Sequence, residues 1–341
     1  MTALHIQPKK SWPLSGLEPV CACQYCGDKK KILAHQDVED WSFGCAAGKW
    51  NYWCCQGCKS LYLDVRPTPG TIAEAYGAYY THVPVQGKNV LNRIKERIKN
   101  EYWSLLFRAS VAPRLGLPEW FSFLFRFTKS WVTEPFGLQQ IIQLPKGFLI
   151  DVGCGNGKNL KLAQHLGWNA LGIEVDASAV RVAQDQGLHV THGDYEILSG
   201  YAGKADCIIC SHVLEHVHKP MRLLQLLFLA LKPKGVLLLS VPNASSHLRD
   251  YYGESWRGLE APRHLAIPDA TWLLNHIRSE GFECQQVPSC DAVMMVESER
   301  ISRRALTTSA ADVKAAKNLA RTKLEISLGK QDITQIICTK K

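Results

Sequence analysis

The sequence lacks a long uninterrupted apolar segment. The first ten residues, Met1–Lys10, contain no apolar stretch of the length found in signal peptides. The apolar segment Met221–Val241 is broken by the Lys-Pro-Lys-Gly of Lys232–Gly235, which separates a predicted helix from a predicted strand. Neither segment predicts a membrane span, and we expect a cytoplasmic protein.

Repeats, low-complexity tracts and a strong excess of charge are also missing. The 341 residues carry 40 basic and 31 acidic side chains, a net charge of +9. This excess is too small to predict a nucleic-acid partner, and it favours an anionic substrate only weakly. Hydrophobic residues make up 46% of the chain, enough to bury the core of one large domain and a smaller module.

Cysteine, in contrast, is plentiful. The chain has 13 cysteines, an odd number, which favours a reducing compartment with thiols kept as metal ligands or buried groups. Two C-x-x-C pairs separated by 28 residues suit a tetrahedral structural zinc with no open coordination position, although buried free thiols are the plainer alternative. The predicted ligands are Cys23, Cys26, Cys55 and Cys58. Three neighbours stay open as alternative ligands: Cys21, Cys45 and Cys54.

From about Gly147 the pattern changes to an alternation of strands and helices. Such alternation predicts a parallel sheet with helices on both faces and a ligand across the carboxyl ends of the strands. The predicted strands are 148–152, 170–175, 189–192, 205–210, 235–241, 282–287 and 333–339. The predicted helices are 158–166, 177–186, one ending at 231, 271–280 and 310–326, with a short helix at 71–80 after an exit loop at 64–70.

A glycine-rich loop, Asp151–Gly157, follows the first of these strands. Its glycines permit tight turns and close backbone approach to a ligand, and the next helix offers unpaired N–H groups. A dinucleotide loop needs a third glycine where this chain has Lys158, so that rival is disfavoured. A plain strand–helix turn is the other alternative. The predicted ligand-binding residues are Asp151, Gly153, Cys154, Gly155, Asn156 and Gly157.

Two carboxylates end the next two strands. Glu174, 23 positions after Asp151, is placed to accept both ribose hydroxyls of a nucleoside ligand. Asp194 is placed to accept an adenine amino hydrogen. Each acid alone is more often a solvated strand-end residue, but the two together predict a nucleoside site. Their neighbours Val175 and Tyr195 belong to the same predicted site.

At this point residues 147–243 resemble the class I S-adenosylmethionine-dependent methyltransferases. The resemblance rests on the glycine loop, the two acids, and two later segments, Ala205–Val217 and Leu231–Asn243. It implies an α/β fold with a Rossmann-like, seven-stranded methyltransferase sheet. The last strand of that sheet runs antiparallel, and residues 333–339 can supply it.

The same resemblance implies roles for individual residues. Asp151 faces the ammonium of the cofactor, and Ser211 and His212 lie beside its methionyl part. Glu215 and His216 then lie near the sulfonium, which makes His216 a candidate for direct proton transfer. As alternatives, Ser211 caps a helix and His216 packs against the loop.

The cysteine-rich region with its tail, Ser60–Pro69 and then Tyr76–Tyr80, resembles the N-terminal zinc ribbon of a methyltransferase subgroup often associated with polysaccharide and sugar modification. Sugar C-methyltransferases carry a similar module and a further C-terminal domain, whereas sixty residues follow Gly281 in this chain, so O-methylation is favoured. We expect three parts: a zinc-ribbon module at 1–70, a helical basic-aromatic connector or lid at 71–140, and the methyltransferase domain at 141–341.

The segment Trp256–Leu265 resembles the Pro-Arg-His-Leu segment of that subgroup. His264 is a candidate base for a hydroxyl proton, because an imidazole titrates near neutrality. The alternative is a loop histidine that holds backbone carbonyls. Arg263 suits either an anionic substrate group or a structural carboxylate.

The region before the catalytic domain has two possible roles. Residues 85–132 carry nine Lys/Arg and three Glu, with many aromatic side chains. They either make peripheral contact with an anionic membrane surface or cap the catalytic domain. Tyr76, Tyr79 and Tyr80 form either a lid or part of the core.

The sequence therefore predicts a methyltransferase (EC 2.1.1.-) that uses S-adenosylmethionine and a structural Zn²⁺. We expect in-line O-methylation of a sugar or glycan-pathway intermediate, with a small molecule or glycan as the partner. One alternative is a methyltransferase of a lipid or quinone precursor at the membrane surface. Another is a non-catalytic zinc-dependent binding protein that retains the fold.

Overall fold

The computed structural model describes residues 12–76, nine residues between 94 and 116, and residues 137–289, 292–305, 307–309, 311–315 and 330–341. Tyr79, Tyr80, most of the connector predicted at 85–132 and most of the helix predicted at 310–326 lie outside these residues. None of the helices in the described part of the chain is long and apolar enough to cross a membrane.

The chain divides into two compact units. Unit 1 comprises residues 1–79, 211–225 and 239–338, and unit 2 comprises residues 80–210, 226–238 and 339–341. The three-part division expected from the sequence, with boundaries at residues 70 and 140, stays a prediction.

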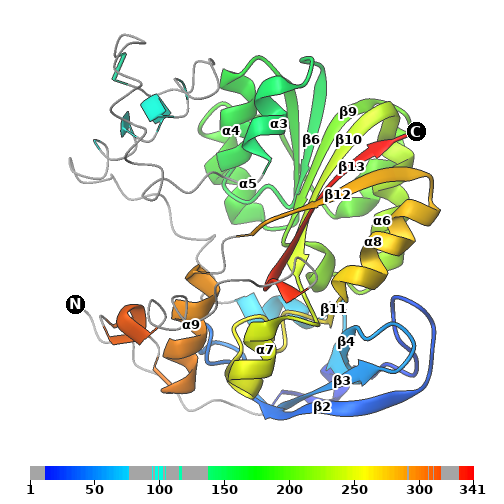
Figure 1. Cartoon of the computed structure of the whole chain (residues 1–341), viewed down its shortest axis with the longest axis vertical. Helices are drawn as coiled ribbons and strands as arrows, with labels where there is room; N and C mark the ends of the chain where they lie inside the picture. Colours follow the sequence, from blue (N-terminus) through cyan, green and yellow to red (C-terminus); the bar gives the residue numbers. More distant parts are fainter. Residues whose placement is uncertain are drawn as a thin grey trace. The chain divides into compact units, whose positions relative to one another are not determined.

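Unit 2 alternates strands and helices. Its parallel strands are β6 (Phe148–Val152), β7 (Asn169–Glu174), β8 (Val190–His192) and β9 (Ala205–Ser211), the last residue of which belongs to unit 1. α3 (Leu138–Gln143) precedes β6, and α4 (Lys158–His165) and α5 (Ala177–Gln184) lie beside these strands in Figure 1. Helices that cover a parallel sheet bury both of its faces, which explains why four consecutive residues of β6, Leu149–Val152, are buried.

Seven strands follow one another in the order β12-β13-β10-β9-β6-β7-β8. The remaining elements of this series are α6 (Pro220–Ala230), β10 (Leu231–Pro242), α8 (Ala270–Ser279), β12 (Phe282–Val287) and β13 (Ile333–Lys340). The predicted seven-stranded α/β fold is confirmed, and the last strand takes its place between β10 and β12. β10 begins at Leu231, before its predicted start at Gly235. In this added part of the strand, Lys232 donates to both carboxylate oxygens of Asp206 at 2.8 Å.

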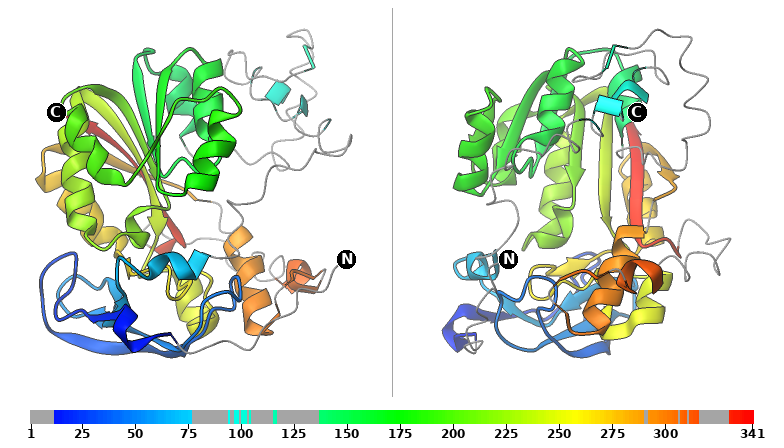
Figure 2. Two further views of the ribbon diagram at one scale, coloured as in Figure 1. Left: turned by 180° about the vertical axis from the view of Figure 1, so that it is seen from behind. Right: turned by 90° about the vertical axis from the view of Figure 1, so that its left-hand side faces the viewer.

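Unit 1 is built on a four-stranded sheet of order β11-β4-β3-β2. Its strands are β2 (Lys31–Val38), β3 (Trp50–Cys55), β4 (Leu61–Leu63) and β11 (Ala266–Ile267), all paired antiparallel. Figure 2 shows the blue N-terminal strands beside the yellow segment that contains α7 (His247–Tyr252) and leads to β11. Segments far apart in the sequence therefore complete one sheet.

The core of unit 1 fastens the segment before β11 to this sheet. Trp50, Tyr52, Leu259 and Leu265 belong to one buried apolar cluster. The Tyr52 hydroxyl lies 2.5 Å from the carbonyl of Leu259 and 2.7 Å from that of His264. α9 (Ala292–Ser302) packs beside α7.

The predicted exit loop at 64–70 contains a strand, so that prediction was wrong in part. β5 (Val65–Pro67) pairs antiparallel with β1 (Leu17–Pro19) in a two-stranded ribbon. Pro67 stands at the end of this ribbon, where its missing N–H costs little. The described part of the helix predicted at 71–80 is the 3-10 helix η2 (Ile72–Tyr76).

Candidate functional site

The glycine loop turns the chain from β6 into α4. Gly153, Gly155 and Gly157 have φ angles of 69°, 54° and 81°, which residues with a side chain rarely adopt. A Cβ at Gly157 would lie 2.2 Å from Leu188 Cδ1, whereas one at Gly155 would meet no atom within 4 Å. Packing therefore requires Gly157, while Gly155 leaves the backbone accessible to a ligand.

Glu174 ends β7 and is oriented by the backbone. Its Oε2 accepts the Gly155 N–H at 2.7 Å, and its Oε1 accepts the Asp176 N–H at 2.9 Å. Each oxygen keeps a further lone pair. The acid predicted to accept ribose hydroxyls is therefore already fixed against the glycine loop.

Asp151 lies inside unit 2, and the side chain has an unsatisfied oxygen. The residue is 2% exposed, and Oδ2 has no hydrogen-bond partner among the described residues. Burial and the nearby charge of Glu174 raise the pKa of Asp151 to about 8. A buried carboxylate with an unpaired oxygen is unfavourable by itself and fits a positively charged group. The site thus suits the ammonium of S-adenosylmethionine.

The other predicted cofactor residues lie next to these acids in the sequence. Asp194 is exposed and accepts the Glu196 N–H at 2.9 Å at the start of the 3-10 helix η5 (Tyr195–Tyr201). Val175, directly after Glu174, is 67% exposed. Cys154 is buried, and Asn156, Tyr195 and Ser211 are half-buried. Their participation in one binding site stays a prediction.

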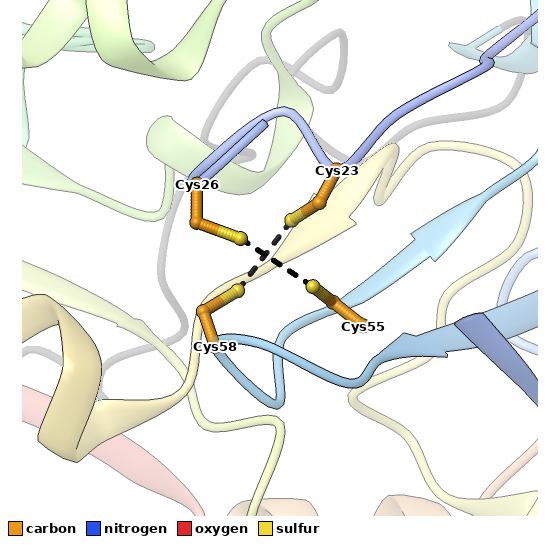
Figure 3. A group of neighbouring side chains, drawn as sticks. All are labelled: Cys23, Cys26, Cys55 and Cys58. Carbon is orange, nitrogen blue, oxygen red and sulfur yellow. Dashed lines mark hydrogen bonds between the residues drawn. The ribbon is translucent and has the colours of Figure 1, made fainter. Parts of the chain in front are cut away.

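The two C-x-x-C pairs meet at one point (Figure 3). The Sγ atoms of Cys23 and Cys58 are 3.5 Å apart, those of Cys26 and Cys55 are 3.4 Å apart, and all four lie within 4.8 Å of one another. Four thiolates around zinc at ~2.3 Å have sulfur–sulfur edges of about 3.8 Å. The donor set and its spacing therefore fit a structural zinc ion.

The three alternative zinc ligands lie outside this group. Cys45 Sγ lies 3.1 Å from the carbonyl oxygen of Ala75, and Cys54 Sγ lies 3.6 Å from that of Cys55. Cys21 is exposed. Among the described residues, the cysteine cluster consists of the two pairs alone.

A polar cluster in unit 1 surrounds His216, which ends the 3-10 helix η6 (Leu214–His216) after β9. Nδ1 lies 3.0 Å from the Tyr76 hydroxyl and 3.1 Å from the carbonyl oxygen of Arg263. Because a carbonyl only accepts, Nδ1 carries the proton and Nε2 the lone pair. Burial lowers the pKa of His216. No described residue hydrogen-bonds to Nε2, so this nitrogen is able to accept a proton at neutral pH.

His264 is buried beside this histidine and is hydrogen-bonded through Nδ1. Nδ1 donates to the carbonyl of Gly258 at 2.6 Å, and Nε2 lies 3.6 Å from Glu260 and 4.0 Å from Glu215. Burial lowers the pKa of His264 to about 4 even though both carboxylates oppose this shift. Its ring meets His216 edge-on with centroids 4.6 Å apart. His264 is thus better placed to orient His216 than to take a proton itself.

Glu215 supplies the negative charge of the cluster. Its side chain is fully buried, Oε1 lies 3.1 Å from His212 Nδ1, and Oε2 has no hydrogen-bond partner among the described residues. Burial opposes ionisation, but the bond to His212 and the neighbouring imidazoles lower the pKa of Glu215. The same bond raises the pKa of His212 against the effect of burial. Atoms of Glu215, His216 and His264 lie within 4.8 Å of one another.

Arg263 binds structural carboxylates. Its fully buried guanidinium donates to Asp40 at 2.5 and 3.1 Å and to Glu260 at 3.0 Å. Neither acid was predicted as its partner from the sequence. Glu260 lies three residues before Arg263, in a turn in which the Arg263 and His264 N–H groups donate to the Glu260 carbonyl, so nearness in the sequence was a usable signal for this acid. Nothing near Asp40 indicates its partner.

Comparison with known proteins identifies the part of the chain that contains the glycine loop. Residues 122–287 match the family described as a methyltransferase domain. This match supports a methyltransferase domain in this part of the chain. The family supports S-adenosylmethionine as the cofactor of the methyltransferase domain, in agreement with the unsatisfied Asp151 carboxylate.

The curated relatives of the methyltransferase domain include ubiquinone biosynthesis O-methyltransferases. That of Coxiella burnetii is 34% identical over 113 residues, which cover 31% of this chain and 48% of the relative. That of Histophilus somni is 32% identical over 125 residues, which cover 32% of this chain and 52% of the relative. The chain therefore spans about half the length of the curated relatives that it matches.

Solved structures of methyltransferases are also similar to this chain. One S-adenosylmethionine-dependent methyltransferase from Archaeoglobus fulgidus has a TM-score of 0.41 and 17% identity, covering 70% of this chain and 98% of its own. Another, from Mesorhizobium loti, has a TM-score of 0.42 and 18% identity, covering 60% and 96%. At these values the likeness adds nothing to the family assignment.

Proposed function

We propose that this chain transfers the methyl group of S-adenosylmethionine to a hydroxyl of a sugar or another glycan-pathway intermediate. The observation that carries the proposal is His216, an imidazole held through Nδ1 with its Nε2 lone pair available. A hydroxyl is a poor nucleophile until it loses its proton, so a positioned base suits such an acceptor.

The cofactor would be held by residues of the glycine loop and the strand ends. Asp151 pairs with its ammonium, Glu174 accepts the ribose hydroxyls, and Asp194 accepts the adenine amino hydrogen. Ser211 and His212 contribute beside the methionyl part. When bound, the cofactor supplies an activated methyl group on a sulfonium, so the protein's main tasks are alignment and exclusion of water.

His216 would take the hydroxyl proton of the acceptor on Nε2. The resulting imidazolium is stabilised by Glu215, and the Tyr76 hydroxyl and Arg263 carbonyl keep the ring in place. His264 fixes the ring edge-on and lies between two carboxylates. We assign proton transfer to His216 and orientation to His264.

Zinc at the four cysteines would have a structural role, because all four coordination positions are filled by thiolates. The cluster joins the turn after residue 22 to the turn between β3 and β4. It would thereby order the region that contributes Tyr76 and the four-stranded sheet, as expected for a zinc ribbon.

A quinone precursor is the second candidate acceptor. The observation that favours it is the printed function of the curated relatives, ubiquinone biosynthesis O-methyltransferases. A phenol is already far more acidic than a sugar hydroxyl, with a pKa near that of tyrosine, ~10, and so depends less on a base. The effect of removing His216 therefore separates the two acceptor classes.

The test is methyl transfer from isotopically labelled S-adenosylmethionine to a panel of nucleotide sugars, free glycans and catechols, read by mass spectrometry of the products. We expect label on a sugar oxygen in the wild-type protein and loss of that label in His216→Ala. Binding of the cofactor without transfer to any member would instead favour the non-catalytic alternative. Label on a catechol alone would move the acceptor to the quinone-precursor class.

A further inference from the structure

We propose that Asp40 and Arg263 form a positioning pair that aligns His216 with Tyr76. A loop of the cysteine-rich N-terminal region would then set the geometry of the proton acceptor. This inference rests on the proposed role of His216, although part of its test does not.

The guanidinium of Arg263 holds three separate stretches of chain. It is fully buried and donates to both carboxylate oxygens of Asp40 at 2.5 and 3.1 Å. It also donates to the carbonyl of Ala75 at 2.7 Å and to Oε1 of Glu260 at 3.0 Å. Planar, bidentate pairing of this kind fixes direction as well as distance.

Asp40 is equally confined on its own side. Its carboxylate accepts the backbone N–H groups of Phe43, Cys45 and Ala46 at 3.1, 3.0 and 2.9 Å. The guanidinium of Arg263 also lies over the ring of Phe43, 4.6 Å from its centroid. The hydrogen bond and charge of Arg263 lower the pKa of Asp40 against the effect of burial. Residues 40–46 are thus wound around the ion pair.

Both contacts of His216 Nδ1 are made by residues that Arg263 positions. The first is the carbonyl of Arg263 itself, at 3.1 Å. The second is the hydroxyl of Tyr76, at 3.0 Å, and Tyr76 directly follows the Ala75 carbonyl that Arg263 holds. One guanidinium therefore determines where both partners of Nδ1 lie, and with them the direction in which Nε2 points.

The experiment compares charge-neutral variants of each partner in the full-length protein. Asp40→Asn and Arg263→Gln remove opposite charges, and the double variant removes both while keeping hydrogen-bonding side chains. Asp64→Asn is the matched control, because Asp64 lies in the same N-terminal region and pairs with Lys31 at 3.1 Å. Three quantities are measured: kcat and its pH profile, affinity for S-adenosylmethionine, and the tautomer of His216 from imidazole ¹⁵N shifts.

Each single variant should lower kcat about 10- to 100-fold, as expected for a misplaced reacting group. The affinity for S-adenosylmethionine should stay within twofold, and Asp64→Asn should match the wild type. A purely electrostatic role would move the pH midpoint in opposite directions in Asp40→Asn and Arg263→Gln and leave the plateau intact. The double variant should be no worse than the poorer single one, because the two residues act as a unit.

The ¹⁵N shifts should show the proton on Nδ1 in the wild type and a mixture of tautomers in the single variants. The pair is not a positioning pair if kcat and the tautomer in Asp40→Asn equal those of Asp64→Asn. It is also not one if cofactor affinity falls in parallel with kcat. If a single variant does not fold, the neutral double variant makes the same comparison. If the wild type methylates nothing, the proposed function fails, while the tautomer measurement still decides this inference.

Discussion

Unit 2 and unit 1 prepare their residues for chemistry by different means. In unit 2 the backbone positions the site residues: the glycines have positive φ, and two amide N–H groups hold Glu174. In unit 1 buried charged side chains position them, with Arg263 between Asp40 and Glu260 and with Glu215 beside two histidines. The first kind of site depends on contacts between segments that are near one another in the sequence. The second forms only after segments that are distant in the sequence have packed together.

This difference has an energetic consequence. A backbone-built loop tolerates changes elsewhere, since its hydrogen bonds are local. Buried ion pairs do not, because removing one partner leaves an unpaired charge in the interior, at a cost of about 3–5 kcal/mol. The two units should therefore respond differently to perturbation.

The largest expected effect comes from the cysteine cluster. Chelation of the metal, or Cys55→Ala, should abolish methyl transfer, because structural zinc commonly contributes ~10 kcal/mol or more to the folding of its module. Binding of S-adenosylmethionine should weaken by less than about tenfold, since all of the proposed cofactor residues except Ser211 and His212 belong to unit 2. Calorimetry with metal analysis on the same sample checks both. If cofactor binding were lost together with methyl transfer, the two units would not respond differently, and this prediction would be wrong.

Removal of the proposed base should come next. His216→Ala should lower turnover by about 10²- to 10⁴-fold, the usual range for a general base. His264→Gln should cost less, about tenfold, if that ring only orients its neighbour. Cofactor affinity should remain that of the wild type in both variants, as measured by calorimetry. Equal losses of turnover in the two variants would contradict the assignment of His216, and not His264, as the base.

Glu174→Gln should act on unit 2 alone. A charged hydrogen bond contributes about 1.5–3 kcal/mol, so affinity for S-adenosylmethionine should fall roughly 10- to 100-fold. Glu196→Gln is a suitable control, because it makes the same change in unit 2 and keeps the backbone N–H that donates to Asp194 at 2.9 Å. The His216 tautomer should not change in Glu174→Gln. A change there would show that the two units are not independent.

The smallest effect, when it is measured over a single pH unit, is a pH dependence of cofactor binding. The pKa of Asp151 is raised to about 8, so at pH 6 the carboxylate is protonated and must lose its proton to pair with an ammonium. Affinity should therefore rise with pH, by at most ~10-fold per unit, and level off above pH 8. Proton release, seen by calorimetry in buffers of different ionisation enthalpy, checks the sign. Asp151→Asn should bind weakly at every pH without this slope.

The sequence was sufficient for features that are local. The strands at 148–152 and 282–287 lie where their apolar patterns predict them, and the four cysteines meet as the C-x-x-C spacing indicates. The pairing of Asp40 with Arg263 was beyond reach, because no periodicity or motif relates two residues so far apart in the chain. β5 was missed for the same reason, since its partner strand β1 lies at the other end of the module.

The pairing of β11 with β4 limits which segments of this protein could be exchanged with those of a related protein. Within the first C-x-x-C turn, Tyr25 donates to the carbonyl of Ala266 at 3.1 Å, and its ring lies 5.6 Å from that of Trp272 in α8. A gene fusion that exchanged the cysteine-rich region alone would leave these groups without partners and an edge of β4 unpaired. Residues 12–67 and 256–272 therefore form one structural piece, and we expect that a chimaera keeps this sheet only if both segments are exchanged together.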